Sequence, residues 1–457
     1  MRRSFLALLA LGVLLASLTL ATLALHMPGL DMAERITRQN DIVVLMMAAT
    51  AIYFLAVRLV LRHSLPRQAF WVVIFIAFAL RAVLVSAPPF LSSDVYRYVW
   101  DGRVQAAGIN PYRYIPADPA LAFLRDRHVY PHINRRDYAR TIYPPMAELV
   151  FAAVGRISDS VTAMKLAMVG FEVLGVACVL KLLDLSGLPR ERILIYAWNP
   201  LALWSFAAGG HADAPAIGLL GLALLLRARH RDGWAGAILG AATLVKFLPV
   251  VVAPAFVRGG RFWRPALAGA AVIVALYLLY SSAGPHVLGF LPAYGAQEGY
   301  DAGSGFWLLE GLSKLGPLPS WATPAYLVLV ASSLAALALF ILRRRNQEGA
   351  GDIVLLCRDT ALLAACTMVA VSPHYPWYFA WLALPAIVAP TRAVLWLSAA
   401  PLLLYIAPWP HGEFFWRGLI YLPAAALVAA DLLCRSGRSP RFSLASKGDK
   451  ECPMRQP

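Results

Sequence analysis

The sequence has little charge for its length. Only 14% of its 457 residues are Asp, Glu, Lys or Arg, whereas a soluble domain carries roughly 25%. Hydrophobic residues make up 60% of the chain, and apolar runs of about 20 residues, the length that crosses a bilayer as a helix, recur throughout. Such runs are too long for the strands of a membrane barrel. The composition therefore excludes an ordinary soluble domain and predicts an all-α, polytopic membrane protein.

Cysteine pairs and nucleotide-binding loops are also missing. The five cysteines form no CxxC pair, which argues against a disulfide framework or a structural zinc site. No Walker A, GxSxG, HExxH or GxGxxG element stands in a suitable context, so ATP-driven, hydrolase, zincin and dinucleotide-dependent functions are disfavoured. The net charge of +16 would suit nucleic acid, but cytoplasmic loops of membrane proteins collect Lys and Arg. We expect membrane lipid, and no nucleic acid, as a partner.

The apolar runs predict about 12–14 membrane helices in one membrane domain, residues 1–434. The candidate spans are 5–25, 41–61, 69–87, 162–183, 191–207, 213–228, 265–281, 323–342, 353–371, 376–389, 393–408 and 416–433. Segments 143–157 and 234–257 are ambiguous. The remaining residues, 435–457, are predicted to form a basic, disordered cytoplasmic tail.

Basic clusters fix the expected orientation. They follow several of the spans, at 58–67, 190–192, 227–231, 258–264 and 343–345. Placing them all inside, with the N-terminus inside, gives one topology if segments 143–157 and 234–257 do not cross. The second of these contains Lys246 and two prolines, which favours a re-entrant hairpin. The first opens with "YPP" and is short, which favours a partial, outward-facing helix.

The long loop 88–142 then lies on the outer side. It is rich in Tyr, Trp and Pro, which argues against disorder. Its eight arginines and five aspartates give it a net charge of +3, which suits an anionic ligand such as a phosphate head group. A solvated loop touching lipid head groups is an equally good explanation for any single arginine.

The stretch "SSDVYRYVWDGRV" predicts a helix from Ser92 or Ser93 to about residue 107. Helical spacing places Asp94, Arg97 or Tyr98, and Asp101 on one face. A carboxylate at the first turn stays ionised near the positive helix end, and it can accept a proton from an attacking hydroxyl. A helix cap followed by a surface ion pair is an equally weighted alternative.

Three other polar segments are candidate binding sites. "GGHADAP" places His211 and Asp213 at the start of a helix, where Asp213 could instead be a simple cap. Lys246 is an ionisable residue within an apolar segment, which indicates function unless it snorkels to the surface. "SPHYPWYF" adds His374 and Tyr375, although interfacial aromatics also occur as belts.

The stretches "DVYRYVWDGRVQAAGINPY", "TIYPP", "NPLALWSFAAGGHADA", "LVKFLP" and "SPHYPWYF" resemble one bacterial branch of the GT-C membrane glycosyltransferases. That branch includes glycosyltransferase family 87 and the polyprenol-phosphomannose-dependent α-1,6-mannosyltransferases. The resemblance runs from about residue 92 to 381, and the order and spacing of the motifs carry it.

The resemblance implies a GT-C-like enzyme of the bacterial cytoplasmic membrane with its active site on the outer face. The donor would be a polyprenyl-phosphate sugar, here a mannose by family, and the acceptor a lipid-linked or periplasmic glycan. Transfer would invert the anomeric centre, with Asp94 as the catalytic base. Residues expected to bind donor phosphate or sugar are Arg97, Asp101, Arg103, His211, Asp213, Lys246, His374 and Tyr375.

The pattern departs from the family in one respect. Many members have an adjacent acidic pair at this point, whereas Asp94 lies between Ser93 and Val95. No cofactor is therefore expected; a divalent cation is left open as an alternative that no adjacent acidic pair supports. A transporter or flippase of an anionic lipid-linked substrate, and a scaffold subunit of an envelope complex, remain as alternatives.

Overall fold

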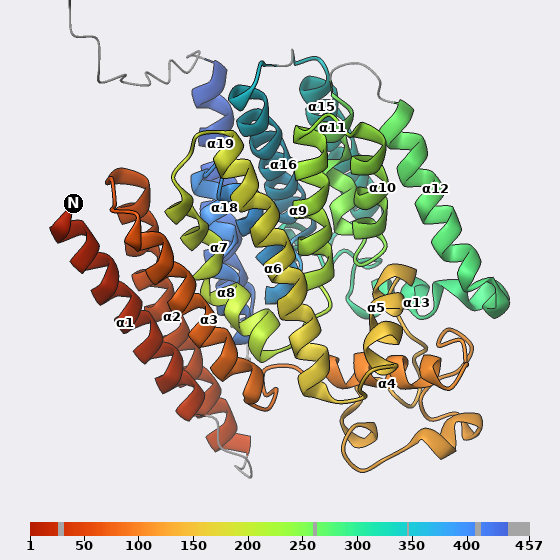
Figure 1. The fold of residues 1–457 in the computed structure, drawn as a ribbon. Helices are drawn as coiled ribbons and strands as arrows, with labels where there is room; N and C mark the ends of the chain where they lie inside the picture. The colour runs from red at the N-terminus through yellow and green to blue at the C-terminus, as the bar shows by residue number, and fades with distance from the viewer. Residues whose placement is uncertain (26–31, 259–262, 345–346, 407–412, 437–457) are drawn as a thin grey trace, which may run out of the picture.

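The computed structural model describes residues 1–25, 32–258, 263–344, 347–406 and 413–436. Within these ranges all regular structure is helical. The predicted tail 435–457 lies outside the described residues from residue 437 onward. Figure 1 shows a bundle of long helices with a layer of shorter helices and loops at one end.

In the described part of the chain, seven continuous helices are long and apolar enough to cross a membrane. They are α1 (Arg2–Ala24), α2 (Met32–Arg62), α3 (Gln68–Ser86), α6 (Val161–Leu185), α15 (Ala322–Leu342), α16 (Ala350–Val371) and α19 (Glu413–Ser436). The helix α12 (Trp263–Leu279) meets the same criterion only together with the following segment, Ser281–Gln297, across a bend of 110°, and this bent pair would be an eighth span. The protein is thus an all-α, multi-pass membrane protein, as the apolar runs predicted.

Several other predicted spans are broken helices. The segment predicted as 191–207 contains η3 (Arg190–Ile193), α7 (Leu194–Ala197), α8 (Pro200–Ala202) and the π-helix η4 (Leu203–Ala208). Those predicted as 376–389 and 393–408 contain η7 (Pro376–Leu382), α17 (Ala383–Ala386), α18 (Arg392–Leu397) and η8 (Ala400–Tyr405). Proline lacks the amide hydrogen that continues a helix, and Pro200, Pro376 and Pro401 each stand at the start of a new piece.

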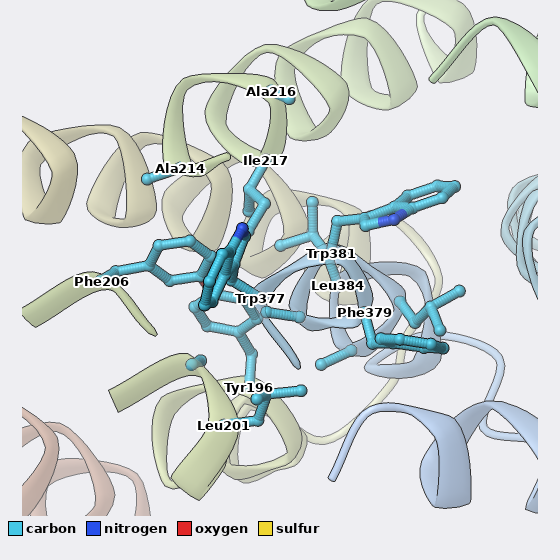
Figure 2. Close-up of a cluster of buried hydrophobic side chains, with 14 of the residues drawn as sticks. Tyr196, Leu201, Phe206, Ala214, Ala216, Ile217, Trp377, Phe379, Trp381 and Leu384 are labelled. Atoms are coloured by element: carbon cyan, nitrogen blue, oxygen red, sulfur yellow. The ribbon is translucent and has the colours of Figure 1, made fainter. Parts of the chain in front are cut away.

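These broken helices and α9 (Ala214–Ala228) form the buried centre of the bundle. Figure 2 shows Trp377 of η7 packed among Tyr196, Phe206 and Ile217, which come from three different elements. All four side chains are at most 7% exposed. Their apolar surface therefore contacts protein on every side, and hydropathy alone cannot distinguish them from lipid-facing helices.

Segment 232–257 forms a hairpin. It consists of α10 (Asp232–Thr243), η5 (Leu248–Val252) and α11 (Ala253–Val257). Arg227, at the end of α9, donates hydrogen bonds of 3.0 Å to the carbonyl oxygens of Phe256 and Arg258. The two ends of the hairpin therefore lie together. At its tip, residues 244–247, Leu244 and Val245 are buried, whereas Phe247 is 37% exposed. This is the geometry expected of the predicted re-entrant segment.

The layer at the lower end in Figure 1 contains the loop 88–142. It holds α4 (Asp94–Ala106), η1 (Pro119–Leu124) and η2 (Tyr130–His132), together with α5 (Pro145–Gly155). Helix α5 has 11 residues and is too short to span a bilayer. A Cβ at Gly102 of α4 would lie 2.4 Å from the carbonyl oxygen of Phe151 in α5, so glycine is what lets the two helices touch.

A second stretch, between α12 and α15, completes this layer. It holds η6 (Ser281–Leu288), α13 (Leu291–Gln297) and α14 (Trp307–Ser313). The Asn110 side chain donates to the carbonyl oxygen of Tyr280 (3.1 Å) and to the hydroxyl of Ser282 (2.9 Å). Two loops far apart in the sequence are thus joined in the layer at this end of the helical bundle.

Candidate functional site

A cavity of about 800 Å³ lies where the layer meets the bundle. Helix α4, the hairpin tip, α13, α15, α16 and η7 all contribute to its wall. Its polar lining residues are Ser92, Ser93, Asp94, Asn134, Arg135, Tyr143, Lys246, Tyr294, Tyr300, Thr367, Tyr375, Trp377 and Tyr378.

Asp94 is the first residue of α4, as its sequence predicted. Its backbone N–H donates to the Ser92 hydroxyl (3.2 Å), and its carboxylate accepts a 2.6 Å hydrogen bond from the side chain of Asn134. Burial raises the pKa of Asp94, although Lys246 and Asn134 act in the opposite direction. A partly exposed carboxylate with a raised pKa is suited to accept a proton.

His211 lies directly behind Asp94. Its Nδ1 is 3.6 Å from a carboxylate oxygen of Asp94, and its ring stacks on Trp377 with centroids 3.8 Å apart. Burial, together with the charge of Lys246, lowers its pKa well below the usual value. His211 is therefore neutral, and neither ring nitrogen has a hydrogen-bond partner among the described residues.

The preceding glycine makes this position of His211 possible. Gly210 has φ = +67°, and an added Cβ would lie 2.9 Å from side-chain atoms of Lys165 and Val95. Any other residue would be strained in this conformation and would clash with α4 and α6. The second glycine of "GGHADAP" is thus a requirement of close packing.

Lys246 stands at the tip of the hairpin and faces the cavity. Its Nζ lies 3.1 Å from Asp213 Oδ2 and 3.9 Å from the centroid of the Tyr378 ring. Asp213 makes no side-chain hydrogen bond to α9, so pairing with Lys246, rather than helix capping, accounts for its carboxylate. Lys246 points into the protein and does not snorkel.

Arg135 supplies a second positive charge to the cavity wall. Its backbone has φ = +53°, and its guanidinium lies 3.3 Å from Glu298 and 5.6 Å from the Tyr294 ring centroid. Neither Asn134 nor Arg135 was singled out from the sequence. Their only signal was the excess of arginine in loop 88–142, because irregular loops have no periodicity that places a side chain.

Arg97 and Asp101 lie beneath Asp94 and outside the lining of the cavity. They form a buried ion pair of 2.9 Å, and Arg97 also donates to the carbonyl oxygen of Ala139 (3.2 Å). This bond holds the segment that carries Asn134 and Arg135 against α4. The structure thus assigns both residues a supporting position.

The other expected binding residues, Arg103, His374 and Tyr375, lie in different places. Arg103 is far from the cavity lining and pairs with Asp126 (2.7 Å) and Asp159 (3.1 Å). Tyr375 lines the cavity, whereas His374 faces a neighbouring one. The structure therefore brings Asp94, His211, Asp213, Lys246 and Tyr375 together and leaves Arg103 apart.

One wall of the cavity is apolar. Leu248 and Val251 of η5, Leu334 of α15 and Val371 of α16 line it. Helix α15 is almost entirely exposed on its outer surface, with 6% of its apolar window buried. The cavity therefore joins a charged end, at Asp94 and Lys246, to a wall beside a lipid-facing helix. Among the described residues no group of three or more His, Cys, Asp and Glu side chains could hold a metal ion.

Comparison with known families gives one match. The family model described as alpha-(1->6)-mannopyranosyltransferase, N-terminal domain, matches residues 5–259. This is more than half of the chain and includes α4, the "GGHADAP" turn and the hairpin tip. The chain therefore belongs to this mannosyltransferase family. No curated protein and no solved structure matches it.

Proposed function

We propose that this member of the α-(1→6)-mannopyranosyltransferase family transfers mannose from a polyprenyl-phosphate donor to a hydroxyl of a glycan or glycolipid acceptor. Asp94 acts as the base, and the anomeric centre is inverted. The reaction takes place on the outer face of a bacterial cytoplasmic membrane, with the N-terminus of the protein inside.

The form of the cavity is the observation that carries this proposal. Its charged end provides Lys246 and Arg135 for a phosphate, while its apolar wall includes Leu334 of α15, a helix with only 6% of its apolar window buried. A polyprenyl phosphate has the same two parts, an anionic head and a long hydrocarbon tail. A volume of about 800 Å³ is within the range of small-molecule sites, and it is sufficient for the sugar, the phosphate and the first part of the tail.

The chemistry balances with the residues at hand. The acceptor hydroxyl gives its proton to Asp94, and its oxygen forms a bond to C1 of the mannosyl group. The bond between C1 and the phosphate oxygen breaks, and polyprenyl phosphate leaves with the electron pair. Lys246 and Arg135 stabilise the negative charge that develops on this oxygen. A single displacement inverts C1, so an α product requires a β-linked donor.

The distribution of charge supports the orientation. The ends of α9 and α11 and the start of α16 carry a buried cluster of charges, in which Arg258 pairs with Asp352 (2.7 Å) and Asp359 (3.3 Å). These ends lie opposite α4 in the bundle (Figure 1). Arg227, Arg229 and Arg344 lie at this end, and by the positive-inside rule an end rich in such residues faces the cytoplasm.

The test uses the purified protein in lipid nanodiscs with a β-mannosyl phosphate of a short polyprenol and a synthetic α-mannoside acceptor. Asp94→Asn keeps the size and the hydrogen bond from Asn134 but removes the base. We expect it to lower transfer by about 10²- to 10⁴-fold, with unchanged abundance and donor affinity.

Asp137→Asn is the matched control, because Asp137 is in the same loop and its side chain is 72% exposed. This variant should retain normal transfer. Asp94 is not the base if Asp94→Asn transfers mannose at the normal rate. The donor assignment is wrong if the wild-type protein consumes no polyprenyl-phosphate mannose.

A further inference from the structure

A second cavity, of about 500 Å³, adjoins the first. Glu298, Glu310, His374, Trp416 and Arg417 are among its lining residues, and Tyr375 lines both cavities. The Tyr375 hydroxyl donates to Glu298 (3.0 Å), which also pairs with Arg135 of the first cavity. Tyr375 and Glu298 thus form a common wall.

The two cavities differ in charge. The first is lined by Lys246 and Arg135 against a single carboxylate, that of Asp94. Three carboxylates and one guanidinium line the second: Glu298, Glu310 and Glu413 with Arg417. Burial acts to raise the pKa of Glu298, but hydrogen bonds from His374 and Tyr375 outweigh it and lower the pKa, so this carboxylate is ionised. An anionic group is repelled here, whereas neutral hydroxyl groups find strong acceptors.

Arg417 also lines the second cavity. It is 8% exposed and is held by Glu310 (2.7 Å) and by the carbonyl oxygen of Gly305 (3.0 Å). Its guanidinium is therefore fixed in the cavity wall, where it can donate to a ligand oxygen.

We propose that the second cavity binds the acceptor as a neutral, mannose-containing oligosaccharide. The inference rests on the proposed function, since it names where the acceptor of that reaction lies. Carboxylates of Glu298 and Glu310 accept hydrogen bonds from sugar hydroxyls, and the Arg417 guanidinium donates one. The Trp416 ring gives an apolar face against which the C–H groups of a pyranose pack. Because Tyr375 lines both cavities, a glycan bound here borders directly on the donor.

Binding of α-(1→6)-linked mannotriose, measured by ligand-observed NMR without donor, tests the proposal. Trp416→Ala leaves the Glu310–Arg417 pair in place and should weaken mannotriose binding by about tenfold or more. Trp416→Phe keeps an aromatic face and should remain within about threefold of the wild type. Trp321→Ala is the control, because Trp321 precedes α15 and is 67% exposed; it should bind normally.

Charge gives a second readout. Mannose 6-phosphate should compete with the polyprenyl-phosphate donor and should not displace mannotriose. In transfer assays, Trp416→Ala should raise the acceptor KM by a similar factor and leave donor affinity unchanged, which marks a loss of acceptor binding alone.

The inference is overturned if Trp416→Ala binds mannotriose as the wild type does, or if mannose 6-phosphate displaces mannotriose. The binding measurement needs no catalysis, so its failure is separate from failure of the proposed function. Absence of transfer by the wild-type protein would refute the latter and leave the binding result as it stands.

Discussion

Replacement of Lys246 separates its structural role from its proposed role in binding phosphate. Lys246 lies 3.1 Å from Asp213, and the side chains are 18% and 5% exposed. Lys246→Met preserves the apolar stem but leaves the Asp213 carboxylate buried without its partner. Breaking a buried pair in this way costs about 3–5 kcal/mol. Since Lys246 retains some contact with solvent, the loss in this variant should lie near the lower limit.

The double variant Lys246→Met, Asp213→Asn removes both charges together. Its stability should recover to within about 1 kcal/mol of the wild type, since no unpaired charge remains. Donor binding should not recover. A hydrogen bond to a charged group contributes about 1.5–3 kcal/mol, so loss of the ammonium should weaken donor binding by about 10- to 100-fold in both variants.

Two measurements on the same samples distinguish these effects. Thermal unfolding in detergent reports stability, and equilibrium binding of polyprenyl phosphate in nanodiscs reports the donor site. Asp213→Asn alone, which keeps the ammonium, should bind polyprenyl phosphate at least as well as the double variant binds it. If the double variant recovers both stability and binding, Lys246 is only the structural partner of Asp213, and its assignment to the phosphate is refuted.

Three further predictions follow from the same geometry. Because burial raises the pKa of Asp94, transfer should fall as the pH drops through a value above that of an ordinary aspartate; a pH profile of kcat/KM whose acid limb lies at the ordinary value of about 4 would contradict this. Gly210→Ala should destabilise the protein by about 1–3 kcal/mol and reduce transfer, because its Cβ meets Lys165 and Val95 at 2.9 Å; unfolding and activity assays check both effects. Arg103→Ala should lower the unfolding temperature without changing the donor KM, because its ion pairs lie away from the cavity; a raised KM would restore it to the binding site.

The helices that could be predicted from the sequence are those whose length the bilayer fixes. The ranges expected for α3, α6 and α15 agree with the structure to within a few residues, because a run of about 20 apolar residues is a local property. The breaks within 191–207 and 393–408 could not be predicted. Buried and lipid-facing helices are both apolar on all sides, so hydropathy does not distinguish them. A proline marks a position where a helix can break, but it does not show that the helix does break there.

The candidate site was predictable to the extent that its residues stand at helix ends. Asp94 opens α4, and Asp213 precedes α9, so capping patterns and charge drew attention to both. Asn134 and Arg135 belong to an irregular loop, and their place beside Asp94 depends on the bond from Arg97 to Ala139, which no local pattern reveals. Arg103 was expected in the site because of its positive charge. Its actual partners, Asp126 and Asp159, are distant in sequence, so its ion pairs could not be predicted.

The proposed phosphate site has a property that follows from its partners. Without donor, Lys246 is paired with Asp213 and Arg135 with Glu298, so neither cation is a bare charge in the protein. Arrival of a phosphate exchanges one anionic partner for another, and departure of the product reverses the exchange. Two unpaired cations would bind the phosphate of the donor and that of the product equally tightly. Such uniform binding does not accelerate the chemical step, and it slows release of the polyprenyl phosphate product. Paired cations respond most to the extra negative charge that develops on the leaving oxygen as the C1–O bond breaks, which is where catalysis needs them. The Glu298 pair also extends to the second cavity, so at the two proposed sites the acceptor and the donor phosphate would contact opposite sides of one ion pair.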